Sequence, residues 1–130
     1  LSGLEALYIR DAHAGADPAY QLNVRVVNET PWANLFAHNL FLRPSVTALD
    51  TFEPEWTILA APSFRAEPGR DGTKAHNFTI INFTKKIILI GGSAYTGEMK
   101  KGIFTVLNYV LPFQGVLPMH CSANIGPEGD

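Results

Sequence analysis

The sequence has one cysteine, few charged residues and no long hydrophobic run, and each shortage excludes a class of protein. A single cysteine among 130 residues cannot form a disulfide framework, so a reducing compartment, the cytoplasm, is expected. No uninterrupted apolar stretch approaches the roughly 18 residues of a membrane span. Ten Lys and Arg against 12 Asp and Glu give a net charge of -2, without the basic excess typical of nucleic-acid or membrane-surface binding. The composition predicts a globular protein with neither nucleic acid nor membrane as a partner.

The scarcity of charge has a second implication. Charged residues make up 17% of the chain, whereas an average domain has about 25%. The length fits one domain, and the chain starts at Leu1, with neither an initiator methionine nor a signal-peptide pattern. We therefore expect a piece of a larger protein, whose remainder covers apolar surface on this one.

Hydrophobic periodicity predicts an α/β fold, with a mixed sheet and flanking helices. The apolar run Ile87–Ile90 is typical of a central strand covered from both sides. Thr30 is expected to cap a helix, with Trp32 and Phe36 in the core. The predicted strands are 4–10, 20–27, 56–59, 78–83 and 86–90, the loops 11–19 and 62–74, the helices 31–41 and 98–111, and the last extended segment 116–124.

The stretch Gly91–Lys101 indicates a strand, a glycine-rich turn and a helix start. Backbone amides at a helix N-terminus are unpaired and favour an anion. Lys100 and Lys101 lie near that end, where the helix dipole makes each cation unfavourable by about 0.3–1 kcal/mol. Two lysines there need a negative partner, part of which Glu98 could supply. The alternative is a solvated basic face.

Gly92 and Gly97 have the four-residue gap of a phosphate-binding P-loop, but Glu98 stands where that motif requires lysine, so this is not a P-loop.

In a second segment, 117–124, apolar and polar side chains alternate along the chain. As a strand it would place Met119 and Cys121 on an apolar face and His120 on the polar one. Cys121 then behaves as a small buried hydrophobe, which argues against a soft-metal site. By itself His120 is better explained as a hydrogen-bonded surface or core group, and only the Gly91–Lys101 stretch one helix away favours a functional role. The remaining histidines are interpreted as structural or exposed: His13 in a loop, His38 on a helix and His76 at a strand entry.

The residues 91–105, GGSAYTGEMKKGIFT, and 117–124, LPMHCSAN, resemble the ATP-dependent phosphoenolpyruvate carboxykinases. The match extends over the chain, through 24–27, 32–36, 39–44 and 71–73. The resemblance implies a cytoplasmic lyase of gluconeogenesis that decarboxylates oxaloacetate and phosphorylates the product from ATP, giving phosphoenolpyruvate, CO2 and ADP. It also implies a catalytic Mn2+ and Mg2+ bound with ATP.

In such enzymes Tyr95 would lie against oxaloacetate or phosphoenolpyruvate, and Lys100 would neutralise phosphate and carboxylate charge. Lys101 and His120 would bind the catalytic Mn2+ and lie at the nucleotide phosphate, with Lys101 also touching the substrate. Lysine ligates a metal only as the free amine, a form that the neighbouring ammonium of Lys100 favours.

The resemblance also implies that 1–115 belongs to an N-terminal, substrate-side domain and 116–130 to the first strand of a nucleotide-binding domain, within a larger two-domain enzyme. Because these residues contain two metal ligands and no nucleotide-binding motif, we expect the isolated 130-residue chain to be inactive. The alternative is a non-catalytic anion-binding, metal-binding or interaction domain derived from that enzyme. A G-x-x-x-x-G-K-[ST] motif encoded beyond Asp130 would distinguish the two.

Overall fold

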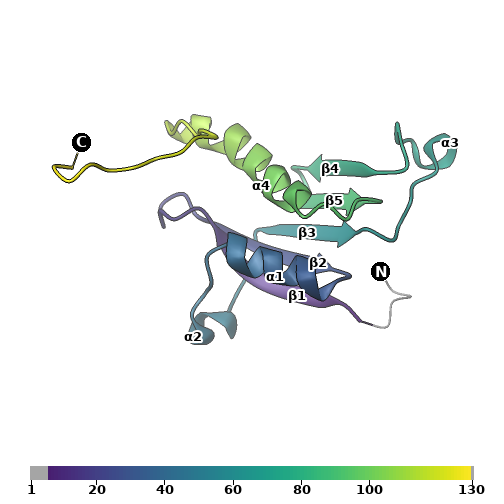
Figure 1. Ribbon diagram of the computed structural model, residues 1–130, viewed down its shortest axis with the longest axis horizontal. Coiled ribbons are helices and arrows are strands. Elements are labelled where there is room, and N and C mark those ends of the chain that lie inside the picture. The colour runs from purple at the N-terminus through teal and green to yellow at the C-terminus, as the bar shows by residue number, and fades with distance from the viewer. Residues whose placement is uncertain (1–5, 130) are drawn as a thin grey trace.

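A five-stranded mixed sheet forms the centre of the protein, and the structure, a computed structural model, describes residues 6–129. The strand order is β1-β2-β3-β5-β4 (Figure 1). The inner pairs β2–β3 and β3–β5 are parallel, whereas the outer pairs β1–β2 and β4–β5 are antiparallel. The predicted α/β fold with a mixed sheet is therefore confirmed. The strands are β1 (Tyr8–Ala14), β2 (Leu22–Asn28), β3 (Trp56–Ala61), β4 (Phe78–Asn82) and β5 (Ile87–Gly91).

Two helices pack on one face of this sheet. Helix α1 (Pro31–Leu40) connects the parallel strands β2 and β3, and α4 (Gly97–Val110) follows β5 (Figure 1). The shorter elements are α2 (Val46–Leu49), α3 (Pro68–Asp71) and the 3-10 helix η1 (Leu111–Gln114). Within the described residues, no helix has the length and apolar character needed to cross a membrane.

The core lies between the sheet and these two helices, because alternate strand residues point toward them. Val24 and Val26 of β2, Ile58 of β3 and Ile88 of β5 are completely buried. Burial of each such side chain stabilises the fold by about 1.5–3 kcal/mol. Met99, Ile103 and Val106 of α4 and Leu111 of η1 are buried, whereas Leu107 and Val110 of α4 are half-buried.

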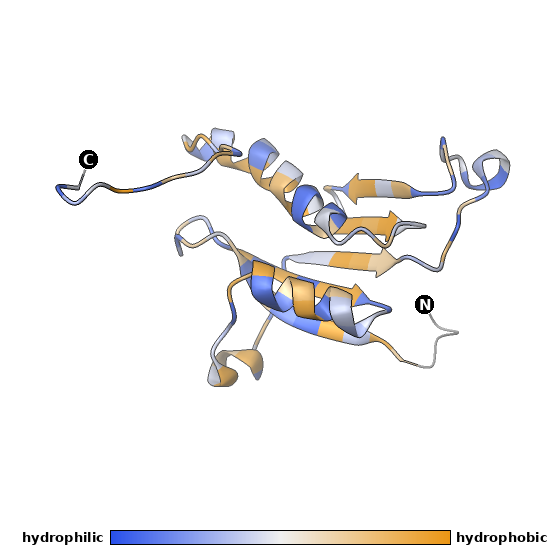
Figure 2. Ribbon diagram, in the orientation of Figure 1, coloured by the Kyte–Doolittle hydropathy of each residue, from blue (hydrophilic) through white to orange (hydrophobic). Residues whose placement is uncertain are grey.

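The opposite face of the sheet presents a continuous row of apolar side chains. One residue from each strand lies in register: Ile9 opposite Val27, Val27 opposite Leu59, and Leu59 and Ile80 each opposite Leu89. Figure 2 shows the hydrophobic colouring along β3, β4 and β5. We call Ile9, Val27, Leu59, Leu89 and Ile80 the apolar row.

The apolar row is partly open to solvent. Leu89 is 37% exposed although β5 lies inside the sheet, and Ile9 is 60% exposed. The central position predicted for Ile87–Ile90 is confirmed, but the expectation that both faces of this strand are covered is wrong for the described residues. The expected exposure of apolar area is confirmed.

The first strand differs from its prediction. It runs from Tyr8 to Ala14, four residues later than the predicted 4–10, whose first two residues lie outside the described part of the chain. The polar residues that indicated a loop are used in cross-strand contacts. Asp11 accepts two hydrogen bonds from Arg25 of β2, at 2.7 and 2.8 Å, and His13 contacts the Asn23 side chain at 2.8 Å. His13 is therefore a strand residue.

Two expectations for α1 are also wrong, although its predicted position is confirmed. The Thr30 hydroxyl makes no capping hydrogen bond and is buried without a partner. Trp32 is 48% exposed instead of lying in the core, because it sits on the solvent side of the first helical turn. Phe36, one turn later, does pack against the core.

The segment 116–124 forms no strand in the structure. It continues after η1 and, among residues 6–129, pairs with no strand (Figure 1). Met119 and Cys121 are both exposed, so the prediction that Cys121 is a buried apolar residue is wrong. Alternation alone cannot bury a face unless another element covers it.

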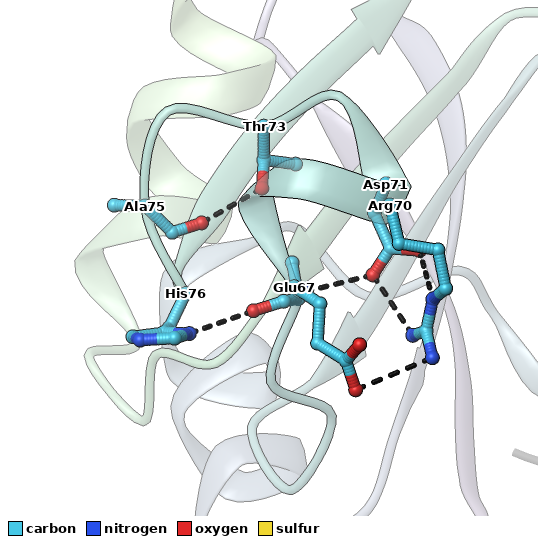
Figure 3. Close-up of polar contacts among 7 residues, drawn as sticks. Glu67, Arg70, Asp71, Thr73, Ala75 and His76 are labelled. Atoms are coloured by element: carbon cyan, nitrogen blue, oxygen red, sulfur yellow. Dashed lines mark hydrogen bonds and ion pairs between the residues drawn. The ribbon is translucent and has the colours of Figure 1, made fainter.

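The loop between β3 and β4 is held by a small polar network around α3 (Figure 3). Asp71 accepts hydrogen bonds from the Arg70 guanidinium and from the backbone amide of Glu67, at 2.8 and 2.9 Å respectively. The His76 imidazole contacts the backbone oxygen of Ala66, at 2.8 Å. The predicted open loop therefore contains one helical turn, and His76 has a structural role.

This network predicts a local opening at low pH. The hydrogen bonds from Arg70 and from the Glu67 amide lower the pKa of Asp71 to about 2, from an ordinary 3.8. Because the pKa is lower in the folded protein, the stabilisation is complete above about pH 4 and is lost as the pH falls through 2. The Glu67 amide NMR signal should titrate with a midpoint near pH 2. In Arg70→Gln the midpoint should rise toward the ordinary value; an unchanged midpoint would contradict this assignment.

Candidate functional site

The predicted strand, glycine turn and helix are present, and they begin at the end of a central strand. β5 ends at Gly91, and α4 begins at Gly97, one residue before its predicted start. Gly92 has a φ of 67°, and a Cβ atom there would lie 2.5 Å from the backbone oxygen of His76. Only glycine fits this turn without strain. The loop therefore leaves the sheet at its carboxyl edge, where α/β proteins commonly bind ligands.

Tyr95 projects from this loop and is 70% exposed. Its ring lies over the backbone of Gly97, so closely that a side chain at position 97 would collide with the ring. Tyr95 also lines a small cavity together with Trp32 of α1 and Pro62, which follows β3. The absence of a side chain at Gly97 thus permits the phenol to lie there.

Lys100 and Lys101 are exposed on the first turn of α4, and neither is paired with a carboxylate among residues 6–129. The Glu98 carboxylate accepts a hydrogen bond from the Thr79 hydroxyl, at 2.8 Å, and so is not the partner considered from sequence. The two ammonium groups remain at the helix end where cations are unfavourable. An anionic ligand would remove that unfavourable interaction.

The side chains of Lys100 and Lys101 point in different directions, since successive residues of a helix are about 100° apart around its axis. Lys100 lines a cavity of about 300 Å³ between α4 and the segment after α1, with His13, Phe104 and Leu42 among its walls. Tyr95 and Lys100 line separate cavities. The described residues therefore place Tyr95 and Lys100 on the same loop–helix unit without bringing their side chains together.

Lys101 and His120 are brought together, although 19 residues separate them. The Lys101 Nζ atom lies 3.4 Å from His120 Nδ1. The His120 ring also packs against Phe104, one turn beyond Lys101, with ring centroids 5.4 Å apart. Phe104 was not predicted from the sequence to be part of this site. Its i+3 spacing from Lys101 is the signal that could have revealed it, since such residues share a helix face.

The pair has the chemistry of a metal site. In a tetrahedral zinc site, two nitrogen ligands at about 2.0–2.1 Å from the ion are about 3.3 Å apart. The 3.4 Å between Lys101 and His120 matches this, provided that the lysine binds as a neutral amine. Among residues 6–129 no three His, Cys, Asp or Glu side chains gather to hold a metal ion. Lys101 and His120 offer two nitrogen donors at a spacing that one metal ion allows.

Fold and site together define an α/β protein in which a glycine loop at the sheet edge leads into a helix with two adjacent lysines, the second facing a histidine. The chain belongs to the ATP-dependent phosphoenolpyruvate carboxykinase family, because the family model described as phosphoenolpyruvate carboxykinase matches residues 1–130. The resemblance found in the sequence is thereby confirmed.

Individual relatives agree with this assignment. The chain is 60% identical over 125 residues to "Phosphoenolpyruvate carboxykinase (ATP)" of Flavobacterium johnsoniae, covering 95% of this chain and 23% of the relative. It is 59% identical over 129 residues to the protein of the same name from Christiangramia forsetii, covering 98% and 24%. For that of Geobacillus kaustophilus the identity is 55% over 126 residues, covering 97% and 24%. The chain thus spans about a quarter of the length of these relatives.

Proposed function

We propose that this chain forms the substrate-side and metal-binding part of an enzyme that converts oxaloacetate and ATP to phosphoenolpyruvate, CO2 and ADP. The observation that carries the proposal is the Lys101–His120 pair, because family membership alone does not identify the residues that act. The gluconeogenic direction and a cytoplasmic location belong to the proposal. The free, exposed thiol of Cys121 is compatible with a reducing compartment.

Each residue has a distinct role in this proposal. The exposed Tyr95 hydroxyl donates a hydrogen bond to a carboxylate of oxaloacetate or phosphoenolpyruvate. The Lys100 ammonium neutralises carboxylate and phosphate charge. Lys101 and His120 hold Mn2+ through their nitrogen atoms and lie at the nucleotide phosphate, with Lys101 also beside the substrate. In phosphoryl transfer such positioning and charge neutralisation supply most of the catalysis.

When bound, Mn2+ would polarise substrate and phosphoryl oxygens as a Lewis acid, and Mg2+ would accompany ATP. The chain's own contribution is to place Lys101 Nζ beside His120 Nδ1, so that both nitrogen atoms could bind one ion. The Lys101 ammonium donates a hydrogen bond to the lone pair of His120 Nδ1. Metal binding therefore requires the release of a proton from Lys101.

We also propose that further parts of the enzyme cover the apolar row. Sheets with parallel inner strands are nearly always covered on both faces, whereas here the helices lie on one. The domain boundary is proposed near Gly115, with 116–130 beginning the nucleotide-binding domain. Strand pairing with that domain would give the segment 116–124 the neighbour it lacks in this structure.

The other candidate function is a non-catalytic anion-binding or metal-binding domain. It is favoured by the content of the chain, which has two metal donors and no nucleotide-binding motif, and we expect the isolated chain to be inactive for the same reason. The proposed enzyme and a metal-binding domain both require the metal site, so metal binding tests what these two share.

Mn2+ binding is the direct test of the site. Titration of the chain with Mn2+, followed by the electron paramagnetic resonance of the free ion, should show one saturable site. His120→Ala should weaken it by about tenfold or more, because the loss of one nitrogen leaves the ion with fewer protein ligands.

His76→Ala is the matched control, because His76 contacts only the backbone of its own loop among the described residues. It should leave the affinity unchanged. Unchanged affinity in His120→Ala would remove His120 from the site, and an equal loss in both variants would indicate non-specific binding to histidine.

A further inference from the structure

Two arginines converge on one imidazole at the end of α1. Arg10 NH1 lies 2.9 Å from His38 Nδ1, and Arg43 NH1 lies 3.0 Å from His38 Nε2. Neither arginine forms an ion pair with a carboxylate among residues 6–129. His38 is therefore held between two permanently charged donors.

The geometry leaves one hydrogen-bond acceptor missing. A neutral imidazole has one donor and one acceptor nitrogen, and an imidazolium has no acceptor, whereas arginine only donates. Only one of the two His38 contacts can therefore be a hydrogen bond. Partial burial and the two guanidinium groups lower the pKa of His38, so the neutral form is favoured.

The position of Arg10 determines which ring nitrogen of His38 carries the lone pair. Its Nε and NH2 groups both donate to Oδ1 of Asn34, at 3.0 and 2.6 Å, and Asn34 is buried. Because Arg10 is anchored in this way, we assign its third contact as a hydrogen bond into Nδ1 of His38. Nε2 of His38 then carries the proton and faces the N–H groups of Arg43, so that two donors meet with no acceptor between them.

These two donors border a cavity. His38 and Arg43 line a space of about 520 Å³, together with His13 and Gln21, and the described residues around it include no acid. The volume is within the range of about 300–1,000 Å³ typical of small-molecule sites. A charge-assisted hydrogen bond is roughly twice as strong as a neutral one, which favours an anionic acceptor here.

We propose that Arg43 and His38 form a binding site for a small oxyanion, a phosphate or carboxylate group, separate from the site at Lys101 and His120. One anionic oxygen accepts from His38 Nε2, in the place that an Arg43 N–H group takes at 3.0 Å, and a second accepts from the Arg43 guanidinium after its exposed side chain has turned aside. Arg10 and Asn34 act as positioning residues that hold the His38 ring and its tautomer. The ligand supplies the missing acceptor.

NMR of the ¹⁵N-labelled imidazole tests the proposal in two ways. In the free protein His38 should be neutral, with its proton on Nε2; a proton on Nδ1 would overturn the assignment. Titration with inorganic phosphate at constant ionic strength should then shift the Nε2 signal and saturate. A parallel titration with malonate tells phosphate from carboxylate as the preferred source of the oxyanion, and the proposal fails if neither saturates.

Variants show whether the binding is local. Arg43→Gln, which removes the charge on an exposed side chain, should weaken binding by about tenfold or more. Arg70→Gln is the matched control, because it removes the same charge from the distant α3 network. Equal weakening by both variants, or an equal effect of chloride, would show general charge screening and overturn the site.

Discussion

Replacing Lys101 with methionine in the complete enzyme should reduce the rate of phosphoenolpyruvate formation by at least about 10³-fold. This corresponds to about 4 kcal/mol of lost transition-state stabilisation, the effect expected when a group at the developing charge is removed. Lys101 is exposed, and its side chain takes no part in the core, so the fold should be unaffected. The measurement is the steady-state rate with oxaloacetate, ATP and Mn2+.

Lys101→Arg separates metal binding from charge. Arginine keeps the positive charge but remains protonated in proteins, so it has no lone pair for Mn2+. Its activity should be nearly as low as that of Lys101→Met, and its Mn2+ affinity should fall in parallel. Activity close to that of the unchanged enzyme in Lys101→Arg would show that charge alone matters and would exclude ligation by Lys101.

Lys85→Met is the control for these variants. Lys85 is an exposed lysine in the turn between β4 and β5, and its backbone amide, not its side chain, donates the hydrogen bond to Asn82. Loss of its charge should leave the rate within about twofold. A comparable loss in Lys85→Met would mean that the overall charge of this surface, and not the Lys101 site, determines the rate.

The strands were predicted correctly where apolar alternation is strong. The prediction failed where polar residues form cross-strand pairs. Alternation in β2 and the apolar run in β5 located both strands to within two residues. In β1 the polar residues Asp11 and His13 indicated a loop, yet each finds a partner on β2. Such a partner can be identified only when the register between the strands is known.

The candidate site was predictable from composition only in part. The coincidence of glycines, a helix start and adjacent lysines indicated an anion site, whereas His120 by itself was better explained as a structural group. Its pairing with Lys101 depends on the chain turning back after α4 through η1, which no local pattern encodes. The Arg10–His38–Arg43 cluster was missed for the same reason, because its members come from β1, α1 and the segment after α1.

The second prediction concerns the free energy of unfolding. It compares two neighbouring residues of β5 whose side chains face opposite sides of the sheet. Ile88 is completely buried beneath α4, where its side chain approaches Gly102, whereas Leu89 belongs to the apolar row and is 37% exposed. Ile88→Ala should lower the free energy of unfolding of this chain by about 2–5 kcal/mol, because it leaves a cavity in a packed core. Leu89→Ala should cost less than about 1.5 kcal/mol, since solvent already reaches the side chain. Urea denaturation of both variants measures the difference.

The same pair tests whether another part of the enzyme covers the apolar row. In the complete enzyme, the cost of Ile88→Ala should stay the same, because its surroundings are already complete. The cost of Leu89→Ala should rise toward that of Ile88→Ala, because covering the row removes the leucine from water and makes its truncation a cavity. An equal cost of both variants in the 130-residue chain would contradict the one-sided core. A small, unchanged cost of Leu89→Ala in the complete enzyme would show that the row stays open, so that the low charge content of the chain needs another cause.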